Sequence, residues 1–86
     1  MSENLSQLRS RIDELDIEIV NKIQERASIA SKIGEVKRAN GEEIFRPDRE
    51  KEVYKKVTMN NPGPLPDQAL ISIYREIMSG DRKSVV

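Results

Sequence analysis

The first 40 residues of this 86-residue chain carry one uninterrupted helical pattern, whose length limits what the chain can fold into. Apolar residues recur there every three or four positions, as on the buried face of a helix. They are Leu5, Leu8, Ile12, Leu15, Ile19, Ile23, Ala27, Ala30, Ile33 and Val36. Asn40 and Gly41 provide the stop signal, because glycine readily takes the left-handed conformation that follows a helix end. We therefore predict a helix over residues 5–39, roughly 52 Å long at 1.5 Å per residue.

A helix of this length is longer than the globule to which it would belong. A compact domain of this size has a radius of gyration of about 12 Å, so the apolar stripe must extend beyond it. Only 36% of the residues are hydrophobic and 35% are charged. A chain this short and polar buries little surface by itself. We therefore predict a homodimer in which paired long helices cover each other's stripes.

Two shorter helices are predicted to follow a loop at residues 42–46. Pro47 suits the first position of a helix over residues 47–59, and Asp48 and Glu50 suit its positive end. A breaker-rich turn at residues 60–66 precedes a third helix, which begins near Pro66 or Asp67 and ends near residue 80 or a little beyond. The predicted inward residues are Val53, Tyr54 and Val57 of the second helix and Ala69, Leu70, Ile73, Ile77 and either Tyr74 or Met78 of the third. The predicted fold is all-α, with three helices in a single domain spanning residues 1–86.

Composition excludes several classes of function. The chain has no His and no Cys, which rules out zinc sites built on these ligands, Cys nucleophiles and Ser-His triads within it. Fifteen basic residues balance fifteen acidic ones and only three aromatic residues are present, so we expect no nucleic-acid binding. No apolar run reaches about 18 residues and the N-terminus is polar, so we expect neither a membrane span nor a secretory signal. The absence of disulfides fits a cytoplasmic location.

Cations interrupt the stripe of the long helix. Arg26 and Lys37 are eleven residues apart, which places them on one face and roughly 16 Å apart along the axis. They could converge on one small molecule, or both could extend outward at the edge of the stripe. Arg9 lies nearly 26 Å from Arg26 along the same helix, so it cannot share a pocket with Arg26 of its own subunit. Arg9 is either a solvated surface residue or, in an antiparallel helix pair, a neighbour of the partner's Arg26.

The start of the second helix is another candidate anion site, because the free backbone amides of a first helical turn attract anions. Pro47 fixes the backbone there. Arg46, Pro47, Asp48, Arg49 and Glu50 form this segment. Arg49 could clamp a carboxylate while Glu50 accepts from a hydroxyl. Alternatively, Arg49 is solvated and Glu50 only complements the helix dipole.

Several segments, in order and at matching spacing over nearly the whole chain, resemble the all-helical chorismate mutases. They are Leu8-Arg9, Ile12-Asp13-Glu14-Leu15-Asp16, Glu25-Arg26, Ile33-Gly34-Glu35-Val36-Lys37, Arg46-Pro47-Asp48-Arg49-Glu50 and Ile73-Tyr74-Arg75-Glu76-Ile77-Met78-Ser79. The chain is especially similar to mutase domains fused to prephenate dehydratase or to the first enzyme of the aromatic pathway. The resemblance implies an intertwined homodimer with two identical sites. It also implies that chorismate rearranges to prephenate with no cofactor, chemistry for which the lack of His and Cys is no obstacle.

The resemblance also implies roles for individual residues. Arg9 resembles the arginine donated across the dimer to one substrate carboxylate, and Arg26 resembles the in-subunit arginine that grips the other. Lys37 matches the lysine that bonds the ether oxygen and a carboxylate. Arg49 resembles a supporting cation, and Glu50 resembles the acceptor for the substrate hydroxyl.

The resemblance is weaker at three positions. Arg46 stands where the family often has another residue that contacts the hydroxyl through its backbone. Asp81 stands where the best-known members have a small hydroxyl residue, and its carboxylate would repel a substrate carboxylate unless it is neutralised. Val85 stands in place of Gln or Glu and cannot hydrogen-bond to the ether oxygen. Two alternatives therefore stay open: an isochorismate pyruvate lyase on the same scaffold, and a non-catalytic dimerisation or regulatory module.

Overall fold

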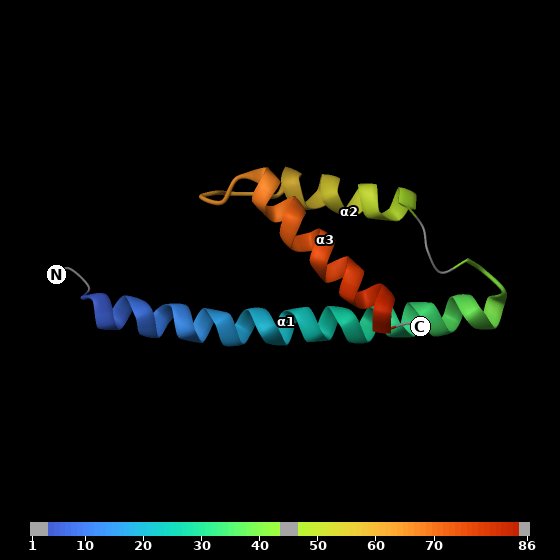
Figure 1. Cartoon of the computed structure of the whole chain (residues 1–86), viewed down its shortest axis with the longest axis horizontal. Helices are drawn as coiled ribbons and strands as arrows, with labels where there is room; N and C mark the ends of the chain where they lie inside the picture. Colours follow the sequence, from blue (N-terminus) through green and yellow to red (C-terminus); the bar gives the residue numbers. More distant parts are fainter. Residues whose placement is uncertain (1–3, 44–46, 85–86) are drawn as a thin grey trace.

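The structure, a computed structural model, describes residues 4–43 and 47–84 of the chain. It contains three helices within these residues and no strand: α1 spans Leu5–Asn40, α2 spans Pro47–Met59 and α3 spans Asp67–Ser84 (Figure 1). None of the helices in the described ranges is long and apolar enough to cross a membrane. The predicted all-α fold with three helices is confirmed. The helix limits match closely, and α3 continues one turn past residue 80.

Local signals define both ends of α1. At its start, the Asn4 side chain accepts a hydrogen bond from the Gln7 amide at 2.8 Å, and the Gln7 side chain accepts from the Asn4 amide at 3.0 Å. This reciprocal capping box satisfies amides that have no partner within the helix. At its end, Gly41 has a φ of 73° and its N–H donates to the Arg38 carbonyl at 3.2 Å. The predicted glycine stop is therefore confirmed, whereas the capping box at the start had not been predicted.

The Asn61 side chain organises the turn between α2 and α3. Its Nδ2 donates to the Leu65 carbonyl at 2.9 Å and to the Asp67 carboxylate at 2.8 Å. Its Oδ1 accepts from the Gly63 amide at 2.9 Å, and Gly63 has a φ of 76°, which glycine adopts without strain. These bonds hold the turn closed and direct α3 back along α2.

The third helix joins the other two. It packs against α2 and against α1, and in Figure 1 it runs diagonally from the far end of α2 down to α1. Val53 and Met78 are buried in this contact. Six other predicted inward residues of α2 and α3 are half-buried: Tyr54, Val57, Ala69, Leu70, Tyr74 and Ile77. The prediction for Ile73 is wrong in the protomer: the residue is 44% exposed, although it lies on α3 between the half-buried Ala69 and Ile77.

The N-terminal half of α1 has no neighbour among the described residues. Every residue from 5 to 22 is exposed, and in Figure 1 the start of α1 (blue) projects beyond α2 and α3. The radius of gyration is 16.5 Å, against about 12 Å for a compact domain of this length. The accessible surface is 7105 Å², against roughly 5,200 Å² for a compact monomer of this mass. The apolar stripe is therefore left uncovered within one protomer.

Candidate functional site

Arg26 occupies the point where α3 meets α1. Its Nη1 donates to the Asp81 carboxylate, and its guanidinium lies over the Tyr74 ring, 5.9 Å from the ring centroid. The Arg26 side chain is 34% exposed and the Asp81 side chain is 11% exposed. Arg26 thus points toward α3 instead of extending into solvent. Desolvation makes such an ion pair stronger than a surface pair but costly if one partner is removed.

Lys37 lies on the same side of α1 as Arg26, since eleven residues are about three helical turns. It is half-buried, as is Glu50 in the first turn of α2. Figure 1 shows that the C-terminal part of α1, the start of α2 and the end of α3 all border one side of the protomer. Of the candidate residues, Arg26 of α1 and Asp81 of α3 are in direct contact. Lys37 and Glu50 are half-buried on α1 and α2, two helices that do not contact each other within the described residues.

The remaining candidate residues are not gathered there within the protomer. Arg49 is exposed and pairs with Glu52 across one helical turn at 3.2 Å. Exposed pairs of this kind contribute little to stability, so the Arg49 guanidinium can exchange partners at small cost. Arg9 is exposed and lies about 26 Å from Arg26 along α1. Arg46 and Val85 lie outside the described residues.

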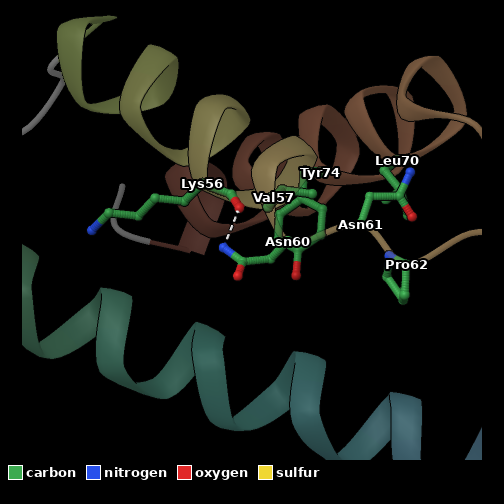
Figure 2. Close-up of a pocket in the computed structure, with 7 residues that line it drawn as sticks. All are labelled: Lys56, Val57, Asn60, Asn61, Pro62, Leu70 and Tyr74. Atoms are coloured by element: carbon green, nitrogen blue, oxygen red, sulfur yellow. Dashed lines mark hydrogen bonds between the residues drawn. The ribbon is translucent and has the colours of Figure 1, made fainter.

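A cavity of about 370 Å³ lies at the other end of the α2–α3 hairpin. It is lined by Lys56, Val57, Asn60, Asn61, Pro62, Leu70 and Tyr74 (Figure 2). In Figure 2, Asn60 bends back and donates from Nδ2 to the Lys56 carbonyl at 2.7 Å, which occupies one of its donors. None of the candidate site residues from the sequence lines this cavity, although Tyr74, whose ring contacts the Arg26 guanidinium, forms part of its wall.

Sequence analysis missed the role of Tyr74 beside Arg26. The helical pattern placed Tyr74 only among the apolar residues of the third helix. An aromatic face attracts a cation and excludes water from one side of it, so the ring helps to hold the Arg26 guanidinium in place. No local pattern could have predicted this contact, because its two residues belong to different helices.

Comparison with known proteins identifies the family of this chain. The family model for chorismate mutase type II matches residues 8–84. The chain belongs to this family. The match includes Arg9, Arg26, Lys37 and Asp81, and it ends one residue before Val85. The resemblance to the all-helical chorismate mutases is thereby confirmed.

Individual members of the chorismate mutase type II family are similar in sequence. A bifunctional chorismate mutase/prephenate dehydratase of Aquifex aeolicus is 42% identical over 81 residues, covering 90% of this chain and 22% of that protein. A bifunctional enzyme of the same name from Neisseria gonorrhoeae is 39% identical over 83 residues, covering 92% of this chain and 22% of that protein. The chain thus spans about a fifth of the length of these relatives.

Solved chorismate mutases share the fold described above. A chorismate mutase structure from Thermus thermophilus superposes with a TM-score of 0.91 at 30% identity, over 94% of this chain and 92% of that chain. The chorismate mutase from Helicobacter pylori in complex with prephenate gives a TM-score of 0.82 at 33% identity, over 92% of this chain and 86% of that chain. At 30% and 33% sequence identity, these structures support the family assignment as well as the shared fold.

Proposed function

We propose that this chain is a chorismate mutase, which rearranges chorismate to prephenate without a cofactor. The observation that carries the proposal is the similarity, over 92% of the chain, to the Helicobacter pylori enzyme that was solved in complex with prephenate. No relative or structure described above favours the lyase or the non-catalytic alternative. We keep a cytoplasmic location as part of the proposal.

The proposed site acts first by orienting its substrate. Chorismate carries two carboxylates, a hydroxyl and an ether oxygen, and it must adopt a compact conformer before its bonds can exchange. In the proposal, Arg26 binds one carboxylate, Arg49 supports the site and Glu50 accepts from the hydroxyl. Arg46 contacts the same hydroxyl through its backbone. Holding chorismate in one reactive conformer lowers the activation barrier, because the conformational entropy is then lost on binding and not in the chemical step.

The second task is to stabilise charge on the breaking ether bond. Lys37 supplies an ammonium group on the face of α1 that also carries Arg26. A preorganised donor in a partly desolvated site stabilises developing negative charge more effectively than water does. A pericyclic rearrangement needs no nucleophile and no proton transfer, so cations and one acceptor suffice for this chemistry.

A second copy of the chain completes the proposed site. Arg9 is within one helical turn of the exposed Leu5 and Ile12, so a partner that covers the stripe also contacts Arg9. The midpoint between residues 9 and 26 falls at Ile17, which is 64% exposed. If two antiparallel α1 helices cross there on a two-fold axis, Arg9 of each copy comes level with Arg26 of the other. The protomer's excess surface supports such an intertwined dimer.

We predict a dimer of twice the chain mass in sedimentation experiments, and a dimer that weakens when the stripe is interrupted. Ile12→Lys removes about 1.5–3 kcal/mol of apolar burial from each copy. The dimer dissociation constant should then rise at least about a hundredfold. Ser10→Lys, a change at an exposed polar position on the opposite side of α1, is the control and should have little effect. A stable helical monomer at micromolar concentration would contradict the intertwined assembly.

The proposed activity has a direct test. The purified dimer should consume chorismate, and NMR of the product should identify prephenate as the sole product. Release of pyruvate would instead identify the lyase. No loss of chorismate from a folded dimer would leave the non-catalytic module as the function.

A further inference from the structure

The carboxylate of Asp81 already occupies the guanidinium that the proposed function assigns to a substrate carboxylate. Arg26 Nη1 bonds Asp81 Oδ2 across 55 residues of sequence, from α1 to the last turns of α3. Asp81 is buried, with 8% of its surface exposed, so water screens its charge poorly. The pair is therefore part of the packed structure, in contrast to the exposed pairs elsewhere on α1 and α2.

This arrangement changes what Arg26 can offer a ligand. A guanidinium has five N–H donors but only one positive charge. Nη1 is engaged by Asp81, so an incoming carboxylate meets the remaining donors and a neighbouring negative charge. Two carboxylates held at one cation repel each other, and burial strengthens that repulsion. Neutralisation of Asp81 by Arg26 thus comes at the expense of the ligand.

We propose that Asp81 is an internal competitor for the substrate carboxylate and sets the affinity of the site for its substrate. The inference rests on the proposed function, because it concerns the carboxylate that Arg26 is proposed to bind. The repulsion acts equally on bound substrate and on the transition state, both of which carry that carboxylate. Removing it should therefore lower KM and leave kcat nearly unchanged.

Asp81→Asn is the sharpest test, because it removes the charge while retaining an oxygen that accepts from Arg26. We expect KM for chorismate to fall about tenfold, equivalent to roughly 1.4 kcal/mol. Asp81→Ser, which also lacks the charge but is shorter, should lower KM in the same direction. Glu76→Gln is the matched control, since it removes one carboxylate from an exposed position on the same helix. Its KM should equal that of the wild type.

The opposite result would identify a different role for Asp81. If Asp81→Asn raises KM or leaves it unchanged, Asp81 orients Arg26 or is neutral, and the inference is wrong. If the wild-type chain does not consume chorismate, the proposed function fails separately. Calorimetric titration with prephenate then decides the inference: tighter binding by Asp81→Asn than by wild type supports it. Equal, weaker or undetectable binding by the variant overturns it.

Discussion

Replacing Lys37 with alanine is expected to lower kcat by about two to three orders of magnitude. In the proposed mechanism this lysine is the main charged donor to the ether oxygen, where negative charge grows as the bond breaks. Loss of one preorganised donor of this kind typically costs about 2.7–4 kcal/mol of transition-state stabilisation. The effect is measured as the rate of chorismate loss at saturating substrate. Circular dichroism and sedimentation should show unchanged helix content and an unchanged dimer.

Lys32→Ala provides the matched control for this experiment. Lys32 is exposed on the same helix, about 140° around α1 from Lys37, so the two variants lose the same group from different faces. Lys32→Ala should keep wild-type turnover. Full activity in the Lys37→Ala dimer would mean that the ether oxygen lies elsewhere and that the proposed site is wrongly assigned.

The second large effect concerns the contribution of Arg9 across the dimer. Arg9→Ala and Arg26→Gln should each be nearly inactive, because each removes a carboxylate ligand from both sites. Glutamine at position 26 retains an N–H donor for buried Asp81, so the fold keeps its interaction there. Mixing the two variants under subunit exchange should restore activity to about a quarter of the wild-type value. Half of the dimers are then mixed, and each mixed dimer has one intact and one doubly defective site.

A double variant supplies the control for this restoration. Arg9→Ala mixed with a chain that carries both Arg9→Ala and Arg26→Gln exchanges subunits in the same way, but no dimer then contains Arg9. This mixture should stay inactive. If native mass spectrometry shows mixed dimers of the two single variants and activity does not return, Arg9 does not act across the interface.

Local sequence defined the helices, because helix limits depend on interactions between residues a few positions apart. Gly41 ends α1 in the left-handed conformation that its sequence position predicts, and Pro47 begins α2 as expected. The regular 3.6-residue repeat likewise placed Arg26 and Lys37 on one face of α1 before any tertiary contact was known. The same reasoning predicted a long stripe that one chain cannot cover, and residues 5–22 are indeed exposed in the protomer.

The side of α3 that packs, and the contacts that Arg26 makes, depend on how the three helices dock. Periodicity placed Ile73 on the apolar side of α3 between Ala69 and Ile77, but which residues of that side are covered depends on what docks against them, and Ile73 stays 44% exposed in the protomer. Sequence analysis required some neutralising partner for Asp81 without identifying one. That partner is Arg26, 55 residues away, and a contact at such separation exists only once α3 has docked on α1. The local sequence determines which residues share a face of a helix. Which faces pack together depends on the geometry of the turns and on apolar surface that segments distant in the sequence bury against each other.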